Sequence, residues 1–300
     1  MTQRFDGIQA RRLHRGKPRQ RAGSAATPGL VDKVVDVVHP LLKVPLDGPN
    51  WLLNGATIRA FNEAGRAFLI WAALKSDVAH RSEDPKDREL SEEMMGLLTP
   101  VIKGVLTDKG FEHAVMAQQV FGGHGYIEEH GMSQFVRDAR IAMIYEGANG
   151  IQALDLVGRK LAMNGGRAIQ AFFKEVGEFC EENRADEKMA PFTKALKKGL
   201  NDLQAATMWL MQNAMAKPDN AGAASTDYLH LFGLVALGYM WARMAKVSQA
   251  KLAEGGAAFH EAKLVTARYY MERVMPETSA HLARLSTGAD AMMALPAEAF

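Results

Sequence analysis

The chain has 300 residues, 48% of them apolar, and its 36 lysines and arginines nearly balance its 34 acidic residues. This composition excludes an unfolded chain and gives no electrostatic reason to expect nucleic acid or a membrane as a partner. The single cysteine, Cys180, excludes a disulfide framework within the chain and fits a reducing compartment. We expect Cys180 to be a small buried hydrophobic residue.

Residues 1–55 are predicted to form an irregular or disordered N-terminal arm. Its first part is rich in arginine, with no acid between Asp6 and Asp32, and suits a disordered tail, an organelle transit peptide or the start of a truncated gene product. We favour disorder, because glycine and proline interrupt any amphipathic helix there. The arm lacks the apolar core of a secretory signal, and the expected location is the cytoplasm of a bacterial-type cell rather than the mitochondrial matrix.

Beyond residue 56, apolar side chains recur at three- and four-residue steps, and the alternation typical of strands is missing. The chain is therefore predicted to be all-α. We expect a kink at Pro100 and a helix end at the glycines of 122–125. The predicted helices are 56–84, 87–106, 108–121, 133–144, 149–163, 167–183, 188–216, 225–254 and 257–275.

Short loops between these helices predict up-down helical bundles of antiparallel neighbours. The glycines after Asn164 place a domain boundary near residue 165, which gives a first helical domain at 56–164 and a second at 165–300. The longest apolar run, 227–243, is shorter than the roughly 20 residues that span a bilayer. We therefore expect a buried helix there and no membrane span.

The segment 119–126 (QVFGGHGY) places three glycines within four positions. Taken alone it predicts a turn, because glycine readily adopts positive φ. It is not a dinucleotide-binding Rossmann motif, since that motif follows a strand and the residues before this one are predicted to be helical. His124 and His130 flank the turn without a third ligand at metal spacing, so we expect no metal site.

A single carboxylate, Glu146, lies between two predicted helices, after Tyr145 and before Gly147. Its position alone is explained by the preference of acidic residues for helix N-termini, with a catalytic role as the alternative. Upstream, Arg137 and Asp138 are adjacent in a predicted helix and cannot face one another. Each therefore needs another partner, and we assign both to the scaffold.

The ordered set of 119–126 (QVFGGHGY), 137–140 (RDAR) and 144–148 (IYEGA) resembles the C-terminal domain of acyl-CoA dehydrogenases. That family carries Gln-x-x-Gly-Gly-x-Gly-aromatic, Arg-Asp-Ala-(Lys/Arg) and Ile-Tyr-Glu-Gly-Thr at this spacing. The region 165–300 is similar, through less specific matches, to the extra helical domain of the larger family members. The resemblance implies an FAD-dependent oxidoreductase of fatty-acid oxidation, which introduces an α,β double bond into an acyl-CoA thioester.

In the family, the glutamate removes the α-proton of the substrate, and the resemblance assigns this role to Glu146. It also implies that Tyr145 and Gly147 border the substrate. The FAD-binding positions implied by the resemblance are Gln119, Gly122 and Gly123, which reach the pyrophosphate of a neighbouring subunit's FAD, and Ala148, Asn149 and Gly150. Ala148 stands where the family has threonine, which removes a hydroxyl near the phosphates, and Asn149 is alternatively a helix N-cap.

The resemblance covers residues 56–300, and the family's N-terminal helical and middle β-domains do not fit into 1–55. We therefore expect the C-terminal half of such an enzyme, as a gene fragment or one piece of a split enzyme, with little activity alone. The implied partners are acyl-CoA, further copies or a complementing chain with the flavin-binding domains, and electron-transfer flavoprotein. The alternatives are a non-catalytic helical scaffold for oligomerisation and a CoA-binding module without redox chemistry.

Overall fold

The computed structural model describes residues 49–300 apart from 215, 256–257 and 300, and within them it contains helices and no strands. The predicted all-α class is confirmed, whereas the predicted disorder of the basic arm lies outside the described residues. The α-helices are α2 (Pro49–Arg81), α3 (Pro85–Val120), α4 (Gly123–Tyr126), α5 (Met132–Ala142), α6 (Asn149–Asp155), α7 (Arg167–Glu182), α8 (Ala190–Asn213), α9 (Pro218–Ala253), α10 (Ala258–Tyr269) and α11 (Glu277–Leu285). Single π-helical turns follow α6 at Leu156–Lys160 and α10 at Tyr270–Val274. Short 3-10 turns lie at Glu128–His130, Met163–Gly166 and Ala297–Ala299.

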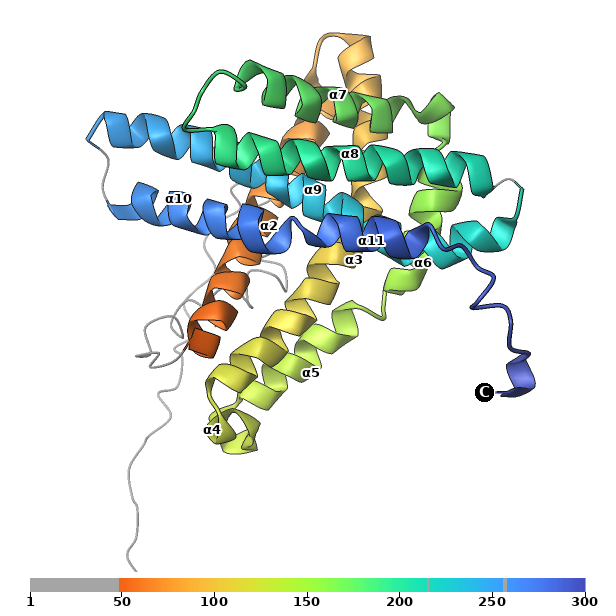
Figure 1. Ribbon diagram of the computed structural model, residues 1–300, viewed down its shortest axis with the longest axis horizontal. Helices are drawn as coiled ribbons and strands as arrows, with labels where there is room; N and C mark the ends of the chain where they lie inside the picture. The colour runs from red at the N-terminus through yellow and green to blue at the C-terminus, as the bar shows by residue number, and fades with distance from the viewer. Residues whose placement is uncertain (1–48, 215, 256–257, 300) are drawn as a thin grey trace, which may run out of the picture.

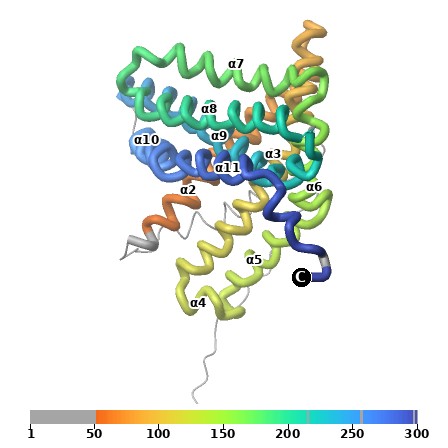
Figure 2. The backbone as a smooth tube through the Cα atoms, turned by 45° about the vertical axis from the view of Figure 1, so that its right-hand side comes forward, coloured from red at the N-terminus to blue at the C-terminus, as the bar shows by residue number. Residues whose placement is uncertain are grey.

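Helices α7, α8, α9 and the pair α10–α11 are stacked in layers, while α2 and α3 cross them steeply (Figures 1 and 2). Helices α4 and α5 lie beside the far end of α3, away from this stack. One core cluster of buried apolar residues extends from Ala60 in α2 to Leu285 in α11. The proposed boundary near residue 165 stays a prediction, and at that place Asn164, Gly165 and Gly166 all have left-handed φ.

Helix α9 is the centre of the core, because nearly every side chain from Tyr228 to Ala242 is buried. Its polar atoms have partners in other helices: the Trp241 indole N–H donates to the Ala60 carbonyl (2.9 Å), and the Tyr270 hydroxyl donates to the Leu234 carbonyl (3.0 Å). The buried helix predicted for 227–243 is thereby confirmed. None of the described helices combines the length and apolar character needed to cross a bilayer.

Helices α3 and α9 cross closely at two glycines. A Cβ atom on Gly104 would lie 2.6 Å from Leu229 Cδ2, and one on Gly233 would lie 2.6 Å from Val105 Cγ2. These distances are below van der Waals contact, so each glycine makes room for a branched side chain of the opposite helix. The crossing positions α3, which carries several residues of the candidate site.

Several predicted boundaries are wrong. Helix α3 continues through Pro100 and Asp108, so the break expected between 106 and 108 does not exist. Helix α2 begins at Pro49, within the segment expected to be irregular. Helix α9 begins at Pro218 rather than 225, because proline is compatible with the first helical turn, and α11 follows Pro276 where no helix was predicted.

The expectation for Cys180 is confirmed. The side chain is buried in the core cluster, and burial raises the pKa of its thiol to about 11. A thiol of this kind stays protonated near neutral pH and packs as a small apolar group.

Candidate functional site

Glu146 lies in the loop between α5 and α6, in a backbone conformation that side chains other than glycine rarely adopt. Its φ is +55° and that of Gly147 is +84°. The Gln152 side-chain amide donates to the carbonyls of Glu146 (3.2 Å) and Gly147 (3.4 Å). The positive φ favours glycine at 147, and a Cβ atom there would also lie 2.7 Å from that amide nitrogen.

The side chain of Glu146 is exposed, as is that of Tyr145. The loop is bordered by large apolar side chains that also face outward, with exposed fractions from 45% to 58%: Ile141, Ile144, Ile151 and Leu154. A base for a weakly acidic C–H needs a desolvated carboxylate, and the described residues alone do not enclose this one. Enclosure therefore requires a covering surface from elsewhere, and the apolar border is suited to contact one.

Lys103 of α3 contacts the same loop. Its ammonium group donates to the Gly147 carbonyl (2.7 Å) and to the Asn149 side-chain oxygen (2.7 Å). The Asn149 amide nitrogen in turn donates to the Asp108 carboxylate (2.6 Å). Because Ala148 occupies the N-cap position and the Asn149 side chain binds α3, the N-cap alternative for Asn149 is wrong. A cofactor contact at this residue would have to use its backbone.

The polar network continues from Asp108 to His230 of α9, whose Nε2 lies 3.0 Å from the second carboxylate oxygen. Burial acts to raise the pKa of Asp108, but hydrogen bonds from His230 and Asn149 outweigh it, and the pKa is lowered. Burial lowers the pKa of Lys103, while the carboxylates of Asp108 and Glu146 oppose that shift. Glu146 and Lys103 are therefore close enough to interact electrostatically.

The glycine turn joins α3 to α4. Each of its glycines is accommodated for a different structural reason. Gly122 has a φ of +58°, and a Cβ atom on Gly125 would lie 2.1 Å from the Gln118 carbonyl oxygen. Gly123 is exposed, with nothing within 4 Å of the position that a Cβ atom would take, and Gln119 beside it is exposed too. The backbone at Gly123 is therefore open to close approach by a ligand.

The two parts of the predicted site lie at opposite ends of α5 (Figures 1 and 2). This helix has 11 residues, which corresponds to a length of about 16 Å at 1.5 Å per residue. The structure therefore brings Tyr145, Glu146, Gly147, Ala148, Asn149 and Gly150 together but keeps them apart from Gln119, Gly122 and Gly123. Ala148 and Gly150 are exposed and remain open to a ligand.

The scaffold assignment of Arg137 and Asp138 agrees with their hydrogen bonds. The Arg137 guanidinium donates to Glu128 (3.0 Å) and Gln134, whereas Asp138 accepts from the Gln134 amide (2.6 Å). The rings of His124 and His130 pack edge to face, with their centroids 5.2 Å apart. Among the residues that the structure describes, no three histidine, cysteine or acidic side chains form a cluster that could hold a metal ion.

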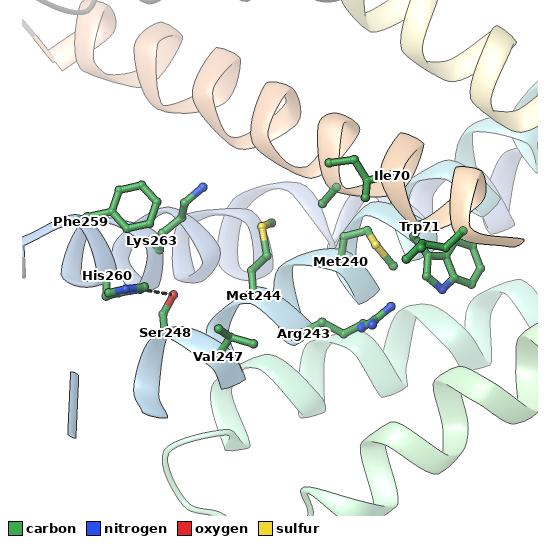
Figure 3. A pocket seen from close by; sticks show the side chains of 12 residues that line it. Ile70, Trp71, Met240, Arg243, Met244, Val247, Ser248, Phe259, His260 and Lys263 are labelled. Atoms are coloured by element: carbon green, nitrogen blue, oxygen red, sulfur yellow. Dashed lines mark hydrogen bonds between the residues drawn. The ribbon is translucent and has the colours of Figure 1, made fainter. Parts of the chain in front are cut away.

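Two features of the structure are not predictable from the sequence patterns described above. One is the network of Lys103, Asp108 and His230, because charged residues at helical spacing give no sign of their tertiary partners. The other is an apolar groove of about 380 Å³ between α2, α9 and α10, lined by residues that include Trp71, Arg243 and Lys263 (Figure 3). Lys263 is paired with Glu63 at 2.6 Å, and none of the predicted site residues lines this groove.

Two family models match consecutive parts of the chain. Residues 69–162 match the model described as acyl-CoA dehydrogenase, C-terminal domain, and residues 172–296 match the model described as acetyl-CoA dehydrogenase C-terminal like. This chain contains the C-terminal domains of the acyl-CoA dehydrogenase family. The resemblance found in the three sequence motifs is thereby confirmed.

The relatives are enzymes named for acyl-CoA substrates. The chain is 35% identical over 281 residues to 3-methylmercaptopropionyl-CoA dehydrogenase of Ruegeria pomeroyi, covering 92% of this chain and 46% of that protein. It is 28% identical over 251 residues to a butyryl-CoA dehydrogenase of Syntrophomonas wolfei, covering 81% and 40%. The fold is similar to that of Caenorhabditis elegans ACDH-11 in complex with C11-CoA, with a TM-score of 0.65 at 18% identity over 81% of this chain and 40% of the other. The chain thus spans less than half the length of these relatives.

Proposed function

We infer that this chain provides the base and part of the cofactor-binding surface of an FAD-dependent acyl-CoA dehydrogenase. Glu146 is the base, and the single observation that carries this inference is its presentation on a fixed left-handed turn bordered by outward-facing apolar side chains. A carboxylate held at that position can take the α-proton of an acyl thioester once an apolar surface covers it. When bound, FAD supplies the oxidant that accepts a hydride from the substrate's β-carbon.

The other residues of the chain bind and orient in this proposal. Tyr145 and Gly147, which are both exposed, border the acyl thioester. Gln119, Gly122 and Gly123 hold the pyrophosphate of an FAD carried by another chain, because the length of α5 separates them from Glu146. Backbone atoms of Ala148, Asn149 and Gly150 line the cofactor near the base. Electron-transfer flavoprotein is the proposed electron acceptor, and the cytoplasm the proposed location.

The test combines the full chain with FAD and with a chain that carries the N-terminal and middle domains of the family. Butyryl-CoA added without oxygen should bleach the flavin absorbance, and Glu146→Gln should slow bleaching by about 10² to 10⁴, the usual contribution of a general base. Glu129→Gln, which changes another exposed glutamate, should bleach at the unchanged rate. Equal bleaching by Glu146→Gln and the unaltered chain would refute the assignment of the base.

A second candidate function is a helical module that only associates with other chains. It is favoured by the exposure of Glu146 together with the apolar groove between α2, α9 and α10. This candidate predicts stable assembly in sedimentation without any change in FAD fluorescence. Quenching of FAD fluorescence by the assembled chain, lost on Gly123→Val, would favour the enzyme instead.

A further inference from the structure

The carbonyl groups of Glu146 and Gly147 both accept hydrogen bonds from side chains outside the loop. The Glu146 carbonyl accepts from Gln152, and the Gly147 carbonyl accepts from Lys103 as well as Gln152. In a trans peptide the C=O and the following N–H point in opposite directions. The N–H groups of Gly147 and Ala148 therefore point away from Lys103 and Gln152, and both residues are exposed.

Lys103 is suited to fix this loop, because its ammonium group binds both the loop backbone at Gly147 and the first residue of α6, Asn149. It donates to the Gly147 carbonyl and to the Asn149 side chain, both at 2.7 Å. The Asn149 N–H closes the same loop by donating to the Met143 carbonyl (3.0 Å). Left-handed φ is unfavourable for a residue other than glycine, so these hydrogen bonds favour the conformation that Glu146 has.

The orientation of the Asn149 side chain is set by two charged residues of α3, Lys103 and Asp108. Asn149 turns its oxygen toward the ammonium group of Lys103 and its amide nitrogen toward the carboxylate of Asp108 (2.6 Å). In the opposite orientation the amide N–H groups would face the Lys103 ammonium group and the amide oxygen would face the Asp108 carboxylate, and both contacts would be repulsive. Asp108 also contacts His230 (3.0 Å), so the chain of contacts runs from the Glu146 loop through α3 to the buried helix α9.

We propose that Lys103 is a positioning residue, which holds the Glu146–Gly147 turn in its left-handed conformation and thereby places the carboxylate. The inference deepens the proposed function, on which the importance of Glu146 rests. Lys103 acts on the backbone and touches no substrate in this role. A lysine that only stabilised α3 would contribute to folding without fixing the loop.

The experiment compares isotope-labelled full chains by nuclear magnetic resonance, without FAD or substrate. Lys103→Met should move the backbone carbon shifts of Glu146 and Gly147 away from values typical of positive φ and speed exchange of the Asn149 amide at least 10-fold. Lys103→Arg, which keeps a donor and a positive charge, should restore the shifts and bring exchange to within about 3-fold of the unaltered chain. Lys109→Met is the matched control, because Lys109 lies on the same helix and pairs with Glu112.

Unchanged Glu146 shifts and Asn149 exchange in Lys103→Met would overturn the proposal. It would also be overturned if Lys103→Met and Lys103→Arg sped exchange throughout α3 equally, since that result describes a purely structural lysine. The measurements need neither cofactor nor turnover, so they are independent of the bleaching test. A failed bleaching test with altered loop shifts would refute the proposed function and leave the role of Lys103 in the loop intact.

Discussion

Helix α9 and the loop at 143–148 differ in the hydrogen-bond partners of their backbone groups. In α9 the hydrogen bonds run within the helix, and side chains from Tyr228 to Ala242 are packed against other helices on nearly all sides. The loop depends on two side chains from outside it, Lys103 and Gln152, and presents Glu146 to solvent. Burial is thus concentrated in α9, whereas the residue proposed for chemistry lies where we expect a substitution to leave the fold intact.

The largest expected effect is in α9. Trp241→Ala should lower the free energy of unfolding by about 3–5 kcal/mol, because it removes a fully buried ring together with its hydrogen bond to the Ala60 carbonyl. Urea denaturation followed by circular dichroism measures the change. Phe259→Ala is the control, since that ring is 61% exposed and its loss should cost far less. Equal losses for the two variants would contradict the assignment of the core to α9.

A second effect depends on pH and concerns His113 of α3. Burial lowers the pKa of this side chain to about 3, so the folded protein binds fewer protons than the unfolded chain, whose histidine titrates near 6.5. Stability should therefore fall as pH decreases from 6.5 toward 3, by about 1.4 kcal/mol per pH unit from this group.

The variant His113→Phe isolates that contribution. Its unfolding free energy, measured by urea denaturation at pH 7 and pH 4.5, should fall by about 2–3 kcal/mol less than that of the unaltered chain. His80→Phe, a change at an exposed position, should leave the pH dependence as it is. The same pH dependence with phenylalanine at 113 would show that His113 is not buried in its neutral form.

The crossing of α3 and α9 gives a smaller effect. Gly233→Ala should destabilise the chain by about 1–3 kcal/mol, because the added Cβ would lie 2.6 Å from Val105 Cγ2. Gly222→Ala tests the same exchange on the same helix where nothing lies within 4 Å, and it should be neutral or stabilising. Destabilisation by Gly222→Ala and none by Gly233→Ala would place the close contact elsewhere.

The smallest expected effect on stability belongs to the loop. Glu146→Gln should change the free energy of unfolding by less than about 0.5 kcal/mol, since the side chain is exposed. Urea denaturation of this variant and of Trp241→Ala compares the loss of unfolding free energy in the two regions. A loss above 1 kcal/mol in Glu146→Gln would mean that the carboxylate serves the fold, and it would weaken the case for a catalytic role.

The sequence by itself determined the helical class, the burial of 227–243 and Cys180, and the family. Helical periodicity and apolar content are local properties that the order of residues carries, and the ordered motifs at 119–126, 137–140 and 144–148 specify the family. Helix ends are less well determined by the sequence, because Pro100 and Asp108 resemble interruptions when α3 is considered without its neighbours.

Only the tertiary structure decided what surrounds the proposed base. Lys103 and Gly147 are 44 positions apart, and Asp108 and His230 are 122 positions apart. Contacts over such separations depend on how α3 crosses α9 and on where α6 begins, which no local pattern encodes. The exposure of Glu146 and its distance from the glycine turn follow from the same packing, since the length and direction of α5 separate residues that one motif set had grouped together.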